Sequence, residues 1–258
     1  MIRISHLSKR YQTAHGVTEA IRDISFDVAQ GEFVSVVGPS GAGKSTLLKA
    51  LAGLHQPSSG AVQYQGKAIT GPQKDFAVVF QDYARSLYPW LTLERNITLP
   101  LDNLIGSAKE RSRIATDFLA RVGLAGMGKK RPSQISGGQQ QRVAIARALA
   151  YSPKVLIMDE PFASVDAQTR AELEDLVLQL KQETEATVIL VTHDIDEATY
   201  MSDRIVVLSR APSVVLKEVV VNLPPVRDQI GTKSLPQFSS VRAEVLQSIR
   251  NPEALVAA

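Results

Sequence analysis

The sequence contains no cysteine among its 258 residues. It therefore has no disulfide framework, and cysteine cannot serve as a metal ligand or as a nucleophile. Long apolar runs are also missing, since none approaches the ~20 residues that a membrane-spanning helix needs. The opening residues, Met1-Ile2-Arg3-Ile4-Ser5-His6, lack the apolar core of a signal peptide. We therefore expect the chain to act in the cytosol.

A strong charge of either sign is likewise absent. The formal net charge is +3, and no block of basic residues stands out, so nucleic acid is not an expected partner. The hydrophobic fraction of 44% and the charged fraction of 21% are typical of a globular protein. At this length the chain can bury the core of one large domain or of two small ones.

One glycine-rich stretch joins an apolar run, residues 33–37, to a helix-like segment, residues 47–51. Strand, glycine-rich turn and helix in this order are typical of a phosphate-binding P-loop, where backbone N–H groups and a helix N-terminus converge on an anion. Lys44 is expected to reach the terminal phosphates, and the Ser45 hydroxyl to bind Mg²⁺. The residues predicted to contact the nucleotide are Gly38, Pro39, Ser40, Gly41, Ala42, Gly43, Lys44, Ser45 and Thr46.

Three other apolar runs end in polar residues, namely Gln81, the pair Asp159-Glu160, and His193. In a parallel sheet such strand ends meet at the edge where ligands bind. In P-loop proteins the aspartate holds Mg²⁺, and Glu160 is placed to polarise a water against the γ-phosphate. Taken singly, adjacent carboxylates are usually a solvated turn, and a lone glutamine or histidine is usually structural. Their shared position beside a P-loop favours a site that hydrolyses a nucleoside triphosphate.

A second helix start with free backbone donors is predicted at Ser136-Gly137-Gly138-Gln139, ahead of the alanine-rich segment 143–149. Serine and glycine at a helix N-terminus can bind an anion, although plain N-capping is their commoner role. Two such starts in one chain are compatible with a bridge between two nucleotides or two protomers.

Residues 2–32 are predicted to be rich in β-strand, because Ile24, Phe26 and Val28 alternate with polar residues. Tyr11 lies in this region. A tyrosine at a strand edge usually only packs, but beside a phosphate loop it is a candidate platform for adenine, since stacking a base on an aromatic ring contributes ~1–3 kcal/mol.

Residues 82–135 differ in character and predict a helical insertion into the α/β core. Tyr83, Tyr88, Pro89 and Trp90 gather in one short segment, and an amphipathic helix follows it. We interpret the aromatic cluster first as the core of this insertion. An exposed patch that docks a partner helix is the alternative.

Together these motifs resemble the ATP-binding subunit of an ABC transporter, in the family's order over about residues 1–222. Ser-Gly-Gly-Gln is the discriminating motif, because the other phosphate-binding motifs occur in many NTPases. The matches are residues 38–46 with Walker A, 155–159 with Walker B, Glu160 with the catalytic glutamate, Gln81 with the Q-loop, 135–139 with the signature sequence (isoleucine replacing leucine), 164–166 with the D-loop, His193 with the switch histidine and Tyr11 with the adenine-stacking aromatic.

The resemblance implies an α/β fold with a P-loop NTPase (RecA-like) core, an N-terminal antiparallel β subdomain and an inserted α-helical subdomain at about 82–150. It implies one ATP-binding domain at 1–222, followed by a short tail at 223–258 with one helix, expected from Val241 to Ile249. ATP and Mg²⁺ are the implied cofactors, with the cation held by Ser45, Gln81 and Asp159.

The resemblance also implies partners. Two ATP-binding subunits would pair head to tail, with each ATP between one P-loop and the Ser136–Gln139 stretch of the other subunit, near Asp166. A membrane permease would dock near residues 82–102, and an extracytoplasmic solute-binding protein would act indirectly. The subunit would then lie at the cytoplasmic face of the plasma membrane. We expect a homodimer of two copies of this chain, and pairing with a close relative stays open as the alternative.

Residues 79–82 and 88–92 resemble importers of nitrate, sulfonates, taurine and related small solutes. Two other functions remain as alternatives. A soluble ABC-type ATPase, for example for cluster assembly, would fit the length. A P-loop kinase or GTPase would not need the Ser-Gly-Gly-Gln helix start.

Overall fold

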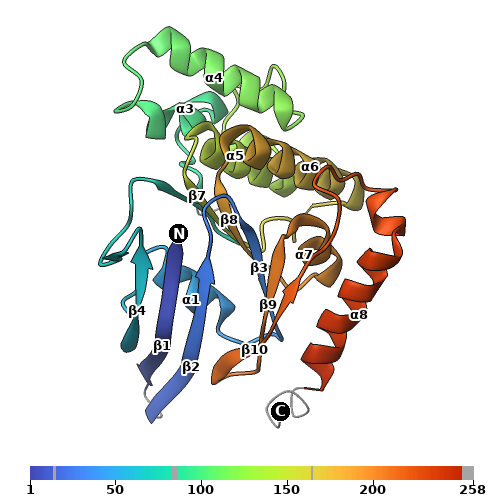
Figure 1. Ribbon diagram of the computed structural model, residues 1–258. Coiled ribbons are helices and arrows are strands. Elements are labelled where there is room, and N and C mark those ends of the chain that lie inside the picture. The colour runs from blue at the N-terminus through green and yellow to red at the C-terminus, as the bar shows by residue number, and fades with distance from the viewer. Residues whose placement is uncertain (14–15, 83–85, 164, 252–258) are drawn as a thin grey trace. The chain divides into compact units, whose positions relative to one another are not determined.

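The computed structural model describes residues 1–13, 16–82, 86–163 and 165–251 (Figure 1). The chain divides into two compact units. The first combines Met1–Phe76 with Thr187–Ala258, and the second comprises Ala77–Ala186. The second unit is thus an insertion between two parts of the first.

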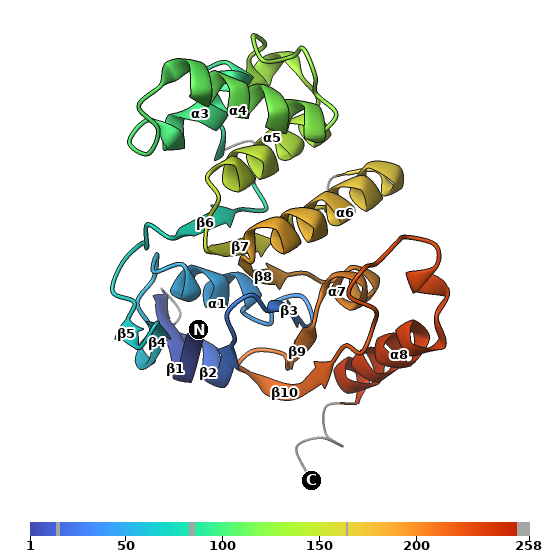
Figure 2. The same ribbon diagram turned by 45° about the horizontal axis from the view of Figure 1, so that its top comes forward.

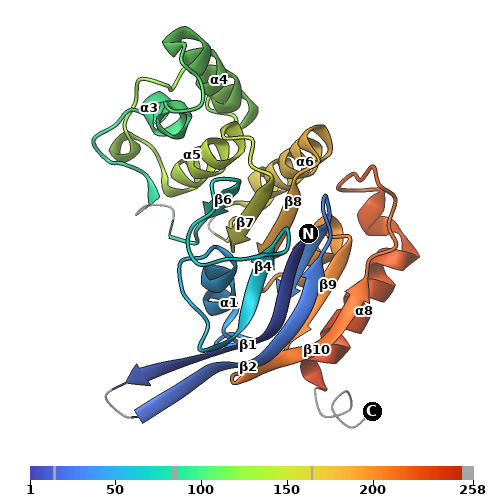
Figure 3. The ribbon, with the colours of Figure 1, turned by 60° about the vertical axis from the view of Figure 1, so that its left-hand side comes forward.

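The first unit contains a mixed sheet with the strand order β5-β4-β1-β2-β10-β9-β3-β8. Its strands are β1 (Ile2–Thr13), β2 (Gly16–Val28), β3 (Phe33–Val37), β4 (Ser59–Tyr64), β5 (Lys67–Ala68), β8 (Thr187–Val191), β9 (Arg204–Leu208) and β10 (Ser213–Val220). β1 pairs antiparallel with β2 and β4, and the β1–β2 ribbon is long (Figure 3). β3 instead pairs in parallel with β8 and β9. The predicted antiparallel N-terminal region is therefore confirmed.

The burial of the strands explains the two kinds of pairing. Ile24, Phe26 and Val28 of β2 are buried and alternate with exposed residues, as in a half-buried antiparallel strand. Every residue of β3 and of β8 is buried, as expected for parallel strands covered on both faces. The parallel strands therefore form the centre of this unit.

The described residues of the first unit form the α-helices α1 (Lys44–Leu51), α7 (Ile195–Met201) and α8 (Pro236–Arg250). A 3₁₀ turn, η3 (Thr232–Ser234), precedes α8. α8 begins at Pro236 rather than at Val241, because proline is well suited to the first helical turn, where its missing N–H needs no partner. α8 lies beside α7 (Figure 2) and shares a buried core with it.

The second unit holds the neighbouring strands β6 (Phe76–Val79) and β7 (Val155–Asp159) and a helical region. Its helices are α3 (Leu93–Thr98), η1 (Leu99–Leu101), α4 (Ala108–Arg121), η2 (Pro132–Gln134), α5 (Gly137–Ala150) and α6 (Ala167–Thr184). α3, α4 and α5 pack against one another, as the predicted helical insertion requires. Among the residues described, no helix is both long and apolar enough to cross a bilayer.

Candidate functional site: a phosphate-binding loop and strand-end residues

The P-loop stretch connects β3 to α1 in the first unit. Gly38 follows β3 so close to β9 that a Cβ there would lie 3.0 Å from the carbonyl oxygen of Leu208. Gly43 precedes α1 with a φ of 72°, in the left-handed region that glycine adopts without strain. The backbone therefore turns tightly onto the start of α1, the geometry of an anion-binding helix N-terminus.

The side chain of Lys44 is buried inside this loop. Its Nζ donates hydrogen bonds to the carbonyl oxygens of Gly38 at 2.9 Å and of Pro39 at 3.0 Å. A buried ammonium needs such acceptors, and phosphate oxygens would form stronger, charge-assisted bonds with it. The neighbouring Ser45 is exposed, so its hydroxyl lies on the accessible side of the loop.

Tyr11 lies beside the P-loop helix. Its hydroxyl is 3.3 Å from Oγ1 of Thr46 and 3.4 Å from Nδ1 of His55. Nζ of Lys9 is 5.3 Å from the centroid of the tyrosine ring, within reach of a cation–π interaction. The structure thus brings Tyr11 next to the end of the P-loop. Sequence analysis did not identify His55, because it lies 44 residues after Tyr11 and no motif connects the two.

β8 carries His193 to the same edge of the sheet as the P-loop. In the parallel pair, Val36 of β3 lies opposite Val191 of β8. The backbone N–H of Thr192 donates to the carbonyl of Val36 at 3.2 Å, and His193 follows with an exposed side chain. The shared edge predicted for these two strand ends is therefore present.

In the second unit, the ends of β6 and β7 bring Gln81 and Glu160 together. Nε2 of Gln81 donates a hydrogen bond to Oε2 of Glu160 at 2.9 Å. Asp159 ends β7 and is only 6% exposed. Glu160 has a φ of 46°, and a non-glycine residue in this left-handed region carries strain of about 1–3 kcal/mol. Such strain is concentrated at functional sites, which is consistent with the predicted role of Glu160.

The predicted magnesium ligands offer oxygen atoms of the kind that Mg²⁺ prefers: a hydroxyl, an amide and a carboxylate. Ser45 belongs to the first unit, while Gln81 and Asp159 belong to the second. The amide nitrogen of Gln81 donates to Glu160, so its oxygen is the atom that could face a cation. No group of three or more His, Asp or Glu side chains that could hold a metal ion occurs within the described ranges.

The Ser136 stretch forms a capping box at the start of α5. Oγ of Ser136 accepts a bond from the Gln139 N–H at 3.3 Å, and Oε1 of Gln139 accepts one from the Ser136 N–H at 3.0 Å. Ser136 and Gly137 are exposed, and Gly138 is half-buried. The N-capping alternative is thus what this single chain adopts, and the capped helix start remains accessible to an anion.

Asp166 of the predicted D-loop caps α6. Its Oδ1 accepts a hydrogen bond from the backbone N–H of Thr169 at 3.0 Å. This bond, followed by one from the Thr169 side chain, holds the pKa of Asp166 below its ordinary value. Arg142 of α5 donates to the hydroxyl of Thr169 and so links α5 to α6. Ser164, also of the predicted D-loop, lies outside the described residues.

The aromatic segment does not form the core of the helical region, so our first interpretation is wrong for Tyr88 and Trp90. These side chains are 40% and 66% exposed, and their ring centroids lie 5.6 Å apart. Leu93 and Ile97 are fully buried instead. Tyr83 lies outside the described residues. An exposed pair of aromatic rings is typical of an interaction surface.

Buried polar side chains hold this aromatic segment in place. Asn96 is fully buried; its Oδ1 accepts from the Tyr88 N–H at 2.8 Å, and its Nδ2 donates to the carbonyls of Tyr88 and Thr92. Arg147 of α5 donates to the Ser86 carbonyl at 2.7 Å, and burial lowers the pKa of Arg147. Sequence reasoning missed both residues. Nothing in the pattern connects Arg147 with a partner 61 residues away.

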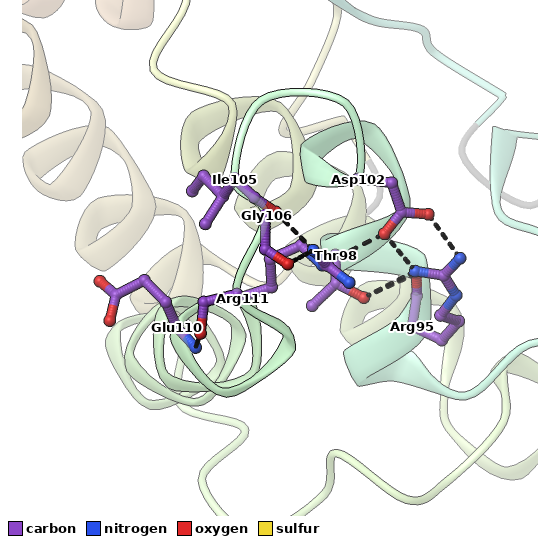
Figure 4. Close-up of polar contacts among 8 residues, drawn as sticks. Arg95, Thr98, Asp102, Ile105, Gly106, Glu110 and Arg111 are labelled. Carbon is purple, nitrogen blue, oxygen red and sulfur yellow. Dashed lines mark hydrogen bonds and ion pairs between the residues drawn. The ribbon is translucent and has the colours of Figure 1, made fainter.

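An ion cluster fixes the connection from α3 to α4 (Figure 4). Arg95 donates two hydrogen bonds to the carboxylate of Asp102, at 2.8 and 2.6 Å. Arg111 approaches the same carboxylate at 3.2 Å and donates to the carbonyls of Ile105 and Gly106. The bonds from Arg95 are the main reason that the pKa of Asp102 is lowered. The aromatic segment is thus followed by a connection that ion pairs and hydrogen bonds cross-link.

Comparison with known proteins adds a family match. A family described as "ABC transporter" matches residues 21–163. The nitrate transport protein NasD of Klebsiella oxytoca is 41% identical over 250 residues, which are 95% of either chain. The bicarbonate transport ATP-binding protein CmpC of Synechococcus elongatus is 44% identical over 88% of this chain and 34% of its own. The chain thus spans about a third of CmpC.

Solved structures agree with these sequence relatives. The ATP-binding cassette MJ0796, solved as a dimer in a post-hydrolysis state bound to ADP and Pi, is similar with a TM-score of 0.78 and 33% identity. The likeness covers 86% of this chain and 99% of that one. The predicted α/β fold with a P-loop NTPase core is confirmed.

Proposed function

The chain belongs to the ABC transporter family and is the ATP-hydrolysing subunit of an importer, and we propose that the imported solute is a small oxyanion. The match to NasD, a nitrate transport protein, over 95% of both chains is the observation that carries this proposal. Nitrate and bicarbonate, named for NasD and CmpC, are both small planar oxyanions. Sulfonates and taurine, the other solutes of the predicted subfamily, stay predictions.

The relatives named above are transport proteins, so they give no support to the soluble cluster-assembly ATPase that we kept as an alternative. The P-loop kinase or GTPase alternative finds no support either, because the family match extends from residue 21 to residue 163 and so includes the Ser136 helix start. The site residues and the relatives both support the same function, the hydrolysis of ATP for transport.

For the nucleotide site, the proposal assigns ATP to the P-loop of one subunit and to the Ser136 helix start of a second. The backbone donors of the P-loop and Lys44 bind the phosphates, and Tyr11 supports the adenine ring. The exposed helix start at Ser136 would approach the γ-phosphate from the second subunit, near Asp166. The support for pairing is the exposed, capped helix start and the dimeric relative.

For the reaction, Glu160 is the proposed general base that takes a proton from the attacking water. Gln81 donates to the Glu160 carboxylate and so orients it. His193, at the end of β8, steadies the γ-phosphate. Mg²⁺, when bound through Ser45, Gln81 and Asp159, supplies charge stabilisation for the phosphate oxygens.

For membrane attachment, the exposed pair Tyr88 and Trp90 is the proposed docking site for a permease, within residues 82–102. Aromatic side chains held on a rigid surface are favoured as binding anchors, because little conformational entropy is lost when they are covered. The subunit would then lie peripherally at the cytoplasmic face of the plasma membrane, and an extracytoplasmic binding protein would deliver the solute.

The experiment that tests this function is to tag the chain, extract it gently from membranes in detergent, and identify the co-purifying proteins by mass spectrometry. The expected partners are a polytopic permease and a solute-binding protein. The binding protein is then titrated calorimetrically with nitrate, bicarbonate, taurine and chloride, and an oxyanion should bind most tightly. Recovery with soluble proteins only would contradict the importer assignment.

A further inference from the structure

His193 stands between β8 and α7, in a segment bonded to the first turn of α7. Oγ1 of Thr192 donates to Oε2 of Glu197 at 2.9 Å and accepts from the Asp194 N–H at 3.0 Å. Oδ1 of Asp194 accepts the N–H groups of Asp196 at 2.9 Å and Glu197 at 3.1 Å, as an N-cap. Both neighbours of His193 are thus attached to α7, so the placement of α7 determines where the imidazole lies.

The C-terminal tail holds the other end of α7. The Arg227 side chain is only 5% exposed and donates to the carbonyls of Tyr200 and Ser202, the latter at 2.9 Å. A cation at the carboxyl end of a helix donates hydrogen bonds to the unpaired backbone carbonyls there. It also interacts favourably with the partial negative charge of the helix dipole at that end. Nζ of Lys233 lies 4.7 Å from the ring centroid of the fully buried Tyr200. Two cations of the tail therefore fix the last turn of α7.

α8 holds the middle and the start of α7. Val241 and Val245 of α8 are buried in one cluster with Ala198 of α7. Nε of Arg242 lies 2.6 Å from Oδ1 of Asp196, in the first turn of α7. Figures 1 and 2 show the two helices side by side. The tail thus contacts α7 at its start, its middle and its end.

We propose that the tail, residues 223–250, positions His193 for ATP hydrolysis by bracing α7, with Arg227 and Arg242 as positioning residues. The inference rests on the proposed role of His193 at the γ-phosphate. Neither arginine belongs to the motifs predicted to bind the nucleotide. Catalytic groups must be held within a fraction of an ångström, and a displacement of about 1 Å that originates away from the reacting atoms can reduce the rate about 100-fold.

The first test replaces Arg227 in the full chain and measures the steady-state ATPase rate. Arg227→Ala should lower kcat on the order of 10- to 100-fold and leave the KM for ATP within about twofold, because the P-loop is untouched. Arg227→Lys, which keeps the charge but not the paired donors, should restore part of kcat. The melting temperature of each variant is recorded beside its rate.

A second test does not depend on the buried arginine and uses a matched pair on α8. Arg242→Gln removes the exposed ion pair to α7, whereas Glu244→Gln removes an exposed ion pair between α8 and Lys217 of β10. Because exposed ion pairs contribute little, Arg242→Gln should lower kcat only about two- to fivefold. Glu244→Gln should leave kcat unchanged, although it loosens the same helix.

The third test combines these changes with His193→Ala. If the arginines act through His193, then Arg227→Ala and Arg242→Gln should cause no further loss of kcat in the His193→Ala chain. A purely structural role would lower kcat by the same factor in either background, which would overturn the inference.

The outcomes separate this inference from the proposed function. A wild-type chain without ATPase activity would defeat the proposed function and with it the inference. Loss of activity in His193→Ala, together with a wild-type kcat in all folded Arg227 and Arg242 variants, would overturn the inference alone. Equal losses of kcat in Arg242→Gln and Glu244→Gln would also overturn the inference, because the contact between α8 and α7 would then matter no more than the contact between α8 and β10.

Discussion

At the scale of single residues, the proposed chemistry depends on side chains whose surroundings restrict them. Glu160 has a left-handed backbone and receives a hydrogen bond from Gln81. Lys44 is folded against the carbonyls of its own loop. Glu160 directly follows the buried strand β7. The side chain of Lys44 is buried, and electrostatic interactions are strengthened where water is excluded.

The first prediction concerns Glu160→Gln. Glutamine has the same shape and can still accept the bond from Gln81, but it cannot take a proton from water. ATP hydrolysis should fall by about 10²–10⁴-fold, while ATP binding persists and a dimer accumulates with ATP. The hydrolysis rate is measured from the release of phosphate, and ATP binding is measured with a filter-binding assay. Dimer formation is followed by size-exclusion chromatography in the presence of ATP.

The matched control is Glu185→Gln, because Glu185 also has a positive φ, of 53°, and is exposed at the end of α6. This variant should hydrolyse ATP at the wild-type rate. A Glu160→Gln chain with normal turnover would remove Glu160 from the role of base.

Asn96 gives the second prediction, on stability. It is fully buried, and Asn96→Ala would leave the Tyr88 N–H without its acceptor and would remove the side-chain donor from the carbonyls of Tyr88 and Thr92, which keep one backbone donor each. We expect a loss of about 2–3 kcal/mol in unfolding free energy. Urea denaturation followed by circular dichroism measures it, with Thr116→Ala on the exposed face of α4 as a control that should change stability by less than ~0.5 kcal/mol.

At the scale of the elements, helix caps and strand ends were predictable from the sequence because their signals are local. Asp194 before α7 and the glycine-rich turn before α1 each appear within a few residues of the element that they define. The onset of α8 at Pro236 was not predicted, and the exposure of Trp90 was only the alternative to our first interpretation. Exposure depends on which distant segments cover a side chain, and composition does not report that.

Asp166 yields a prediction about pH. Its pKa is lowered in the folded chain, so the cap contributes stability that is fully present above the ordinary pKa of 3.8 and is lost as the pH falls through the folded pKa. Amide protection factors in the first turn of α6 should therefore decline below about pH 4. Asp166→Asn keeps an acceptor that does not titrate, so its protection should not change over this range. An identical decline in both chains would refute the assignment.

The docking surface can be tested with a matched pair of exposed apolar residues. Trp90→Ala should weaken the interaction with the permease roughly 30-fold, the effect of losing one aromatic anchor. Leu104→Ala removes a side chain of similar exposure, 59% against 66%, outside the 82–102 segment and should leave the interaction unchanged. A pull-down with each tagged variant, repeated over a range of permease concentrations, measures how much permease is retained. Equal retention of permease by both variants would place the docking site elsewhere.

At the scale of the whole molecule, the candidate site residues divide between the two units. Tyr11, the P-loop and His193 belong to the first unit, and Gln81, Glu160 and the Ser136 helix start belong to the second. The motifs themselves could be read from the sequence, since each is short and lies at a strand or helix end. The long-range contacts of Arg147 and Arg227 could not, because the positions that they join lie 61 and 27 residues apart.

The central claim is that this chain couples ATP hydrolysis to solute import, and the most direct measurement is transport in proteoliposomes. The purified complex with its permease and binding protein is supplied with ATP on the side of this chain and with labelled nitrate or bicarbonate on the other. We predict ATP-dependent movement of an oxyanion toward the ATP side, abolished by Glu160→Gln. Transport that proceeds equally with Glu160→Gln, or ATP hydrolysis without any solute movement, would contradict the account.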